Sequence, residues 1–289
     1  MIGQGSVIPF SNLGNVRITE QIRAGGSANV YIGINEQGDA FAIKIHRPST
    51  YKNYVNVHAK NEASLKTLEH ESIIQILDSC TMEEYGRIYP CTAMEYYPHS
   101  ELFDYIQHKP ISKHGFTQRH AVAEQIVQTI HFLHSRNLIF GDLNPRNILI
   151  NPETNQIKFI DLETVSEMDV ITKNKLWANK EYLAPEIAVH GSDAISFESE
   201  IWNLACILIE WMYPMLWKEY MDAGGWKAII DQRKKGAIDD NELFDSFLPK
   251  QAPEFDSILW PLLRKATMMK ASERCTAHDF IAALEEGLQ

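Results

Sequence analysis

Two short apolar runs near the middle of the chain place the strongest constraint on its fold. They cover residues 140–150 and 157–163, and each is interrupted by a few polar residues. The apolar positions are mostly isoleucine, leucine and phenylalanine, and the turn-forming residues 151–155 separate the two runs. This pattern predicts short strands joined by a turn, with the polar side chains gathered beside them.

Three polar side chains in these runs suggest a chemistry. Asp142 and Asn147 are five residues apart, and Asp161 follows nineteen residues after Asp142. One carboxylate can orient and deprotonate an attacking hydroxyl, while an amide and a second carboxylate hold the Mg²⁺ that neutralises a triphosphate. We therefore expect phosphoryl transfer from a metal-bound nucleotide, with Asp142 as the catalytic base. The alternative for these two runs alone is an ordinary hairpin with a polar loop.

Composition excludes several other classes of protein. The chain has 289 residues, 45% of them hydrophobic, which is enough for two lobes. Its net charge of −11 argues against nucleic-acid binding and against an acidic membrane surface as partner. We expect no membrane segment and no signal peptide. The four cysteines lack the Cys-x-x-Cys spacing, so we expect reduced thiols and a cytoplasmic location.

The chain changes character near residue 97. Before this point, short β-rich runs alternate with glycine-containing turns around one helical stretch, and most of the later sequence is helical. This organisation predicts an α+β fold with two lobes, a β-rich lobe at 1–97 and a mainly helical lobe at 98–289. The expected strands of the first lobe are 16–22, 30–34, 40–45, 73–77 and 87–94, and the expected helices of the chain include 54–68, 102–106 and 119–135.

Lys44 is a candidate phosphate-binding residue. It follows Ala42 and Ile43 in a strand pattern, and a lysine there can bind phosphates if a carboxylate holds its side chain. Glu62, on the expected helix, is the natural partner. The alternatives are a solvated strand lysine and a solvent-facing helix glutamate.

The loop between the first two expected strands contains Gly25, Gly26 and Ser27. Its backbone N–H groups could cover phosphates. The loop is poor in glycine, so an ordinary hairpin is an equal alternative.

Taken in order, these motifs resemble those of a eukaryotic-type (Hanks-type) protein kinase domain, from about residue 14 to residue 285. The resemblance implies a bilobal fold, ATP and Mg²⁺ as cofactors, and a protein or peptide substrate. The residues that carry it are Val30, 42–44, Glu62, 94–97, 142–147, 161–163, 184–186, 201–204 and Arg274.

The resemblance also implies an adenine site. Its residues would be Val30, Ala42 and Leu149 around the ring, Met94 as gatekeeper, Glu95 and Tyr97 as hinge backbone, and Glu101 at the ribose. Asn147 and Asp161 would bind the metal. Glu186 and Arg274 would form a buried ion pair in the helical lobe.

The chain also departs from the family pattern. Gly141 stands where an arginine usually precedes the catalytic aspartate, and Asn144 where serine/threonine kinases carry a lysine near the γ-phosphate. Glu163 replaces the last glycine of the Asp-Phe-Gly motif, which adds an acidic group beside the metal and suggests that Mn²⁺ is accepted as well as Mg²⁺. Glu200 replaces the aspartate that usually steadies the catalytic loop.

Three functions are compatible with these residues. Our interpretation is a serine/threonine protein kinase in which Asp142, Lys44, Glu62 and Asn144 are catalytic. A pseudokinase is the first alternative, because the altered glycine loop, Gly141 and Glu163 could mark lost catalysis. The catalytic-loop motifs also resemble lanthionine-synthetase kinase domains and the aminoglycoside/choline kinases, so a small-molecule kinase is the second. The Ala-Pro-Glu motif at 184–186 and Arg274 favour a protein substrate.

The segment after Asp161 leads to an expectation about regulation. Without an arginine at position 141, a phosphate on this segment would lack a usual cationic partner. We expect packing around Leu176 and Trp177 to hold the segment, and activity without phosphorylation of Thr164, Ser166 or Thr172.

Overall fold

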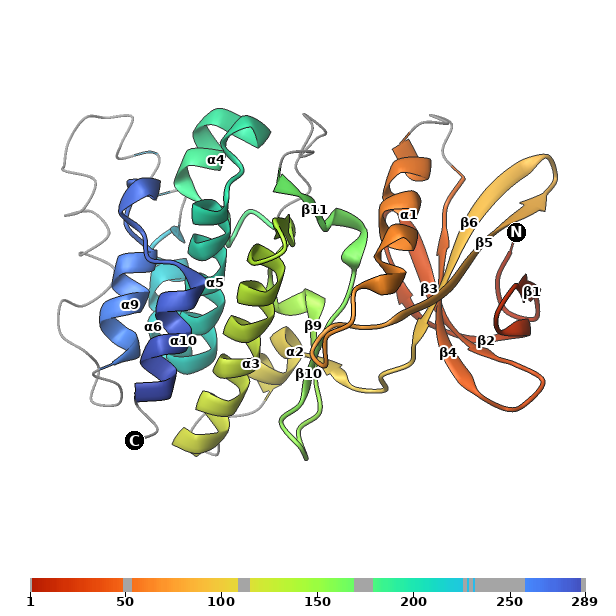
Figure 1. The fold of residues 1–289 in the computed structure, drawn as a ribbon, viewed down its shortest axis with the longest axis horizontal. Helices are drawn as coiled ribbons and strands as arrows, with labels where there is room; N and C mark the ends of the chain where they lie inside the picture. The colour runs from red at the N-terminus through yellow and green to blue at the C-terminus, as the bar shows by residue number, and fades with distance from the viewer. Residues whose placement is uncertain are drawn as a thin grey trace. The chain divides into compact units, whose positions relative to one another are not determined.

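The computed structural model describes residues 2–48, 54–108, 115–168, 179–225, 228, 231 and 258–286. The fold is α+β, as the sequence predicts, and it separates into two compact units (Figure 1). The first unit contains Met1–His99 and Lys158–Val165, and the second contains Ser100–Ile157 and Ser166–Gln289.

A six-stranded antiparallel sheet forms most of the first unit, and helix α1 (Tyr54–Ser64) packs on it (Figure 1). The strand order is β1-β2-β3-β4-β6-β5. The strands are β1 (Val7–Phe10), β2 (Gly14–Ala24), β3 (Ala28–Ile34), β4 (Ala40–His46), β5 (Ile76–Glu84) and β6 (Arg87–Glu95).

Strand β4 separates the core of this unit from its polar cluster. Successive side chains of a strand point to opposite faces. Ile43 and Ile45 are therefore buried in the hydrophobic core with residues of β1 and β2, whereas Lys44 and His46 lie on the face that contacts Glu62 of α1.

Three features of this unit differ from the sequence-based expectations. The edge strand β1 was not expected, and the strand expected at 73–77 begins at Ile76. Residues 72–74 instead pair with Phe159: the Ile74 N–H donates to the Phe159 carbonyl (2.9 Å) and the Phe159 N–H to the Ser72 carbonyl (2.7 Å). This pairing explains why Lys158–Val165 belongs to the first unit although the expected boundary placed it in the second.

The second unit is mainly helical. Helices α3, α5 and α10 lie side by side, and α6 and α9 pack against α5 (Figure 1). A three-stranded sheet of order β10-β9-β7 and the strand pair of β8 with β11 flank the loop that contains Asp142. The helices are α2 (Leu102–His108), α3 (Phe116–His134), α4 (Pro185–His190), α5 (Phe197–Met212), α6 (Pro214–Asp222), α9 (Leu259–Ala266) and α10 (Ala277–Glu286). The strands are β7 (Ser100–Glu101), β8 (Leu138–Ile139), β9 (Ile148–Ile150) and β11 (Ser166–Glu167), while β10 (Ile157–Phe159) leads back to the first unit.

Helix α5 is the central helix of this unit. It begins with a capping box in which the side chains of Ser196 and Ser199 each accept from the other residue's backbone N–H. Its side chains are buried from Ser199 onward with the exception of Asn203, and Trp202 and Trp211 are among the largest fully buried residues. Among the described helices, none has the length and apolar character needed to span a membrane.

Helix α5 also holds the segment that precedes α4. The Tyr182 hydroxyl donates to Glu210 Oε2 (2.5 Å), the Tyr182 ring stacks on Trp217, and the Asn203 amide donates to the Tyr182 carbonyl. Burial raises the pKa of Glu210 to about 7, with the Tyr182 hydrogen bond opposing this rise and Glu181 adding to it. A buried carboxyl group in this environment retains its proton well above its ordinary pKa of 4.5.

This raised pKa predicts a pH dependence of stability. Because the pKa of Glu210 is higher in the folded than in the unfolded state, the unfolded chain ionises first as the pH rises. Glu210 should therefore reduce the free energy of unfolding progressively between pH 4.5 and about 7. Glu210→Gln retains an acceptor for Tyr182 and cannot ionise. We expect the variant to gain stability relative to wild type by about 3 kcal/mol over this range, measured by urea denaturation at about pH 5 and about pH 8. Parallel pH profiles for the two proteins would contradict this assignment.

Candidate active site

Lys44 is the centre of a buried ionic cluster in the first unit. Its Nζ lies 3.2 Å from Glu62 Oε1, 2.5 Å from Asp161 Oδ1 and 2.8 Å from Glu163 Oε2. The lysine is 5% exposed and Glu62 is completely buried. The structure therefore brings together the lysine, its expected helix partner and both acidic residues of the 161–163 motif.

The backbone at Asp161 explains how two carboxylates of one short motif reach the same ammonium group. Asp161 has a positive φ of 62°, a left-handed conformation that aspartate tolerates better than most residues. A 3₁₀ turn (Leu162–Thr164) follows, in which Leu162 is buried while Glu163 lies beside Lys44. The apolar residue anchors the turn, so its two acidic neighbours are held in place.

The charges of the cluster stabilise one another. Burial by itself would lower the pKa of Lys44, but the carboxylates of Glu62, Asp161 and Glu163 outweigh it and raise the pKa. Burial would likewise raise the pKa of Glu62, but Lys44 and His46 outweigh it and lower the value to about 2. Both partners of the Lys44–Glu62 pair are therefore ionised at neutral pH.

The loop that joins β2 to β3 also reaches this cluster. The Ser27 hydroxyl donates to Glu163 Oε1 (3.4 Å). The Gly25 N–H donates to the Ala28 carbonyl (2.9 Å), and a Cβ at Gly25 would lie only 2.8 Å from that oxygen. Gly25 is thus needed for a tight turn whose N–H is used inside the loop, whereas Gly26 has open space around it.

The expected adenine residues of the first unit occupy neighbouring strand positions. Ala42 of β4 is directly opposite Met94 of β6, and Val30 of β3 is opposite Lys44. Glu95 follows Met94, and its Oε2 forms an ion pair with Lys158 (2.9 Å). The Tyr97 carbonyl accepts from the His99 N–H (2.8 Å).

Asp142 is the centre of a hydrogen-bond network in the second unit. Its Oδ1 accepts from Asn144 Nδ2 and from the Asn179 backbone N–H, both at 3.1 Å. Its Oδ2 accepts from Asn147 Nδ2, also at 3.1 Å. Three N–H donors therefore fix the orientation of the carboxylate. The expected residues Asp142, Asn144 and Asn147 therefore form one connected group.

Glu200 of α5 binds the backbone of the loop that contains Asp142. Its Oε1 accepts from the backbone N–H groups of Phe140 (2.8 Å) and Gly141 (3.0 Å), and its Oε2 lies 2.9 Å from His134 Nε2. Glu200, which the sequence marks as a departure from the family pattern, thus binds the backbone of the loop. The sequence did not identify His134 as a partner of this glutamate.

The remaining expected site residues of the second unit lie on one strand pair. Glu101 of β7 is opposite Leu149 of β9, and its carboxylate is 3.9 Å from Arg146. Arg146, which sequence reasoning missed, also lies over the Phe103 ring at 3.5 Å. The sequence signal that could have identified Arg146 is its position inside the 142–147 motif.

The buried ion pair expected in the helical unit is present. Arg274 binds Glu186 through two parallel contacts of 2.6 and 2.8 Å and donates to the carbonyls of Met268 and Glu198. This bidentate pair joins the start of α4 to the residues before α10. Thr172, Leu176 and Trp177, which carried the expectation about the activation segment, lie outside the described residues.

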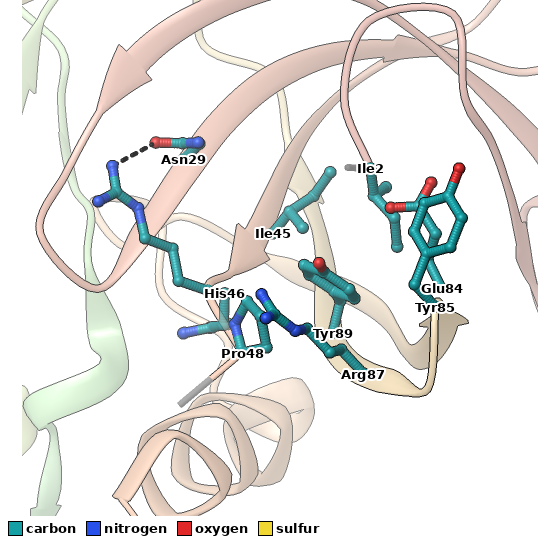
Figure 2. A pocket seen from close by; sticks show the side chains of 10 residues that line it. Ile2, Asn29, Ile45, His46, Pro48, Glu84, Tyr85, Arg87 and Tyr89 are labelled. Carbon is teal, nitrogen blue, oxygen red and sulfur yellow. Dashed lines mark hydrogen bonds between the residues drawn. The ribbon is translucent and has the colours of Figure 1, made fainter. Parts of the chain in front are cut away.

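A separate cavity of about 690 Å³ opens on the first unit (Figure 2). Ile45, Tyr89 and Arg47 are among its lining residues, and the Arg47 guanidinium donates to Asn29 Oδ1 (3.4 Å). His46 also lines this cavity, and its Nε2 is 3.6 Å from Glu62 Oε2. His46 is thus a second partner of the glutamate that holds Lys44, and sequence reasoning did not identify it.

Each unit by itself offers oxygen donors of the kind that a hard divalent cation prefers. In the first unit, Asp161 and Glu163 supply carboxylates. In the second, Asn147, whose Nδ2 donates to Asp142, can offer its amide oxygen. Within the described parts of the chain, no group of three or more His, Cys, Asp or Glu residues forms a metal site by itself. Mg²⁺ in phosphotransfer sites is usually held by one or two carboxylates together with substrate phosphates, and this donor set fits that pattern.

The chain is similar in sequence to several known kinases. Human myosin light chain kinase 3 is 28% identical over 253 residues, which cover 84% of this chain and 28% of that protein. Human tyrosine-protein kinase FRK is 28% identical over 202 residues, or 68% of this chain and 38% of that protein. Mitogen-activated protein kinase kinase kinase A of Dictyostelium discoideum is 25% identical over 198 residues, or 64% of this chain and 20% of that protein. The chain thus spans well under half the length of each of these relatives.

The family comparison covers more of the chain. The model of the protein kinase domain matches residues 16–283, a range that includes the Lys44 cluster, the Asp142 network and the Arg274–Glu186 pair. The chain belongs to the protein kinase domain family.

Proposed function

We propose that this protein is an ATP- and Mg²⁺-dependent serine/threonine kinase that phosphorylates a hydroxyl group of a protein or peptide. The observation that carries the proposal is the formed ion pair between Lys44 and Glu62, with Asp161 on the same ammonium group. An intact pair of this kind is a requirement for phosphoryl transfer in protein kinases.

Each group has a role that its contacts support. Lys44, held by Glu62, binds phosphate oxygens, and Asp161, Asn147 and Glu163 bind the metal. When bound, Mg²⁺ neutralises charge on the phosphates, and a carboxylate-rich site of this kind also accepts Mn²⁺. Asp142 accepts the proton of the substrate hydroxyl at its carboxylate, which the N–H donors of Asn144, Asn147 and Asn179 orient.

The nucleotide base is proposed to contact the remaining expected residues. Ala42, Val30 and Met94 form adjacent apolar positions on the sheet, while the backbone of Glu95 and Tyr97 provides polar groups. Glu101 and Leu149 contribute from the β7–β9 pair. The relatives that match the largest share of this chain are not named tyrosine kinases, which supports serine/threonine specificity.

Two observations favour catalysis over a pseudokinase. Asp142 is oriented by its N–H donors, and Glu200, at the position of the usual aspartate, accepts two hydrogen bonds from the loop backbone. The match to the protein kinase model over nearly the whole chain favours a protein substrate over a small molecule.

The proposed function first predicts the effect of removing the catalytic groups. Asp142→Asn, Lys44→Met and Asp161→Asn should each reduce phosphoryl transfer by roughly 10³-fold or more, because each removes a charge that stabilises the transition state. The measurement is transfer of labelled phosphate from ATP to generic protein substrates and to a panel of small hydroxyl compounds, followed by phosphoamino-acid analysis. Thermal unfolding of each variant serves as the control for folding. Wild-type protein that binds ATP and modifies no substrate would identify a pseudokinase, and phosphotyrosine as the product would overturn the serine/threonine assignment.

A second prediction concerns Glu200 as a positioning residue. Glu200→Ala leaves the Phe140 and Gly141 N–H groups without their acceptor, and an unsatisfied buried donor costs about 1–3 kcal/mol. We expect kcat to fall by roughly tenfold or more while the KM for ATP changes little, because the phosphate-binding groups belong to the other unit. Glu200→Asp, which restores a carboxylate, should recover part of the rate. An equal loss in the two variants would argue against positioning through these bonds.

A third prediction concerns regulation. Gly141 offers no cation for a phosphate, while the Asn179 backbone already contacts Asp142 through a neutral hydrogen bond. We therefore expect phosphatase-treated protein and the Thr164→Ala, Ser166→Ala and Thr172→Ala variants to keep the initial rate of wild type. A tenfold loss after dephosphorylation would show that another cation binds an activating phosphate.

A further inference from the structure

Three carboxylates surround the ammonium group of Lys44. Its Nζ donates hydrogen bonds to Glu62 Oε1 (3.2 Å) and Asp161 Oδ1 (2.5 Å), and Glu163 Oε2 forms an ion pair with it at 2.8 Å. A phosphate oxygen that approaches this lysine from the side of Glu163 must therefore compete with that carboxylate.

Glu163 occupies the position that a phosphate would need. One of its oxygens contacts Lys44 (2.8 Å) and the other accepts from the Ser27 hydroxyl (3.4 Å), so the carboxylate bridges the lysine and the β2–β3 loop. Both of these groups belong to the expected phosphate-binding set. A carboxylate and a phosphate are both oxyanions, and they compete for the same donors.

The other two carboxylates are poorer candidates for displacement. Glu62 is completely buried, and separation from Lys44 would leave an uncompensated charge in the interior. Asp161 makes the shortest contact to Lys44, and its left-handed backbone is held by the turn that follows. Glu163 lies on that turn and has a longer side chain. Its contacts are an ion pair with Lys44 (2.8 Å) and a long hydrogen bond from Ser27 (3.4 Å), whereas Glu62 and Asp161 both accept hydrogen bonds from the lysine. Rotation of the Glu163 side chain breaks these contacts without moving the backbone of the turn.

Charge decides when this displacement is favourable. Three carboxylates surround one ammonium group, so the cluster is negatively charged and repels a polyphosphate. A divalent cation changes this balance, because it offers Glu163 another partner and reduces the charge of the nucleotide.

We propose that Glu163 competes with nucleotide phosphate for Lys44 and Ser27, and that a divalent cation relieves this competition by drawing Glu163 away. Glu163 then makes nucleotide binding strictly dependent on metal, an effect that the glycine usual at this position in the family cannot produce. The inference rests on the proposed function, since it assumes that Lys44 binds phosphate.

The test compares the affinity for ATP in EDTA and in MgCl₂, measured by calorimetry on the full chain, without reference to activity. Wild type should bind ATP weakly in EDTA and tightly in MgCl₂. Glu163→Gln should tighten ATP binding in EDTA by about tenfold, as expected for the loss of one charged competitor. The ratio of the ATP affinity in MgCl₂ to that in EDTA should therefore be smaller in the variant than in wild type. By thermodynamic reciprocity, ATP should then also strengthen Mg²⁺ binding less in the variant than in wild type.

Two further variants distinguish the effect of the bridging contact of Glu163 on ATP affinity from the effect of negative charge alone. Glu163→Asp keeps the negative charge and shortens the side chain by one methylene, so it should bind ATP in EDTA more tightly than wild type if the bridge is the cause. Glu36→Gln removes an exposed charge in the β3–β4 turn of the same unit and should leave both affinities unchanged. Unfolding temperatures check that every variant is folded.

The outcomes are distinguishable. If Glu163→Gln binds ATP in EDTA no better than wild type, or if Glu163→Asp matches wild type while Glu163→Gln does not, the bridging contact is not a competitor and the inference is wrong. If wild type fails to bind ATP even with MgCl₂, the proposed function itself fails.

Discussion

A lysine ammonium group buried in the interior must be surrounded by negative charge, and the polar half of the first unit is organised around this requirement. Lys44 lies on β4. Because successive side chains of the strand alternate, Ile43 and Ile45 point into the core and the lysine points to the opposite face. Helix α1 supplies Glu62 to that face, and the turn after β10 supplies Asp161 and Glu163. If the lysine were removed, three carboxylates would be left close together without a counter-charge, which is why these elements depend on one another.

In the second unit, the corresponding constraint is the orientation of the Asp142 carboxylate, which is proposed to be catalytic. Asp142 is held by N–H donors rather than by a cation, and the loop that carries it is fixed through its backbone by Glu200. Backbone contacts of this kind do not depend on the side chain at position 141. Gly141 can therefore replace the usual arginine without disturbing the geometry of Asp142.

The departures from the family pattern fall into two groups. Glu200 and Asn144 form hydrogen bonds with groups of one loop, since Glu200 accepts from the Phe140 N–H and Asn144 donates to Asp142. Glu163 is different, since it adds an ion pair to Lys44 and a hydrogen bond from Ser27 that a glycine could not form. A substitution that adds a carboxylate to the Lys44 cluster changes the charge of the cluster.

The sequence by itself determined the fold class and supplied most of the residues of the candidate site. The spacing of Asp142, Asn147 and Asp161, the strand pattern at Lys44, and the ordered motifs up to Arg274 are local features, and local periodicity is read directly from residue order. The boundaries of the strands and of the two units were predicted less well from the sequence. The reason is that β1 and the pairing of residues 72–74 with Phe159 depend on partners far away in the chain. Only the tertiary structure decided that Glu163 would contact Lys44 and Ser27, that His46 would lie beside Glu62, and that His134 would pair with Glu200. These contacts join residues more than ten positions apart in the sequence, and the packing of whole elements brings them within hydrogen-bonding distance, so no local pattern encodes them.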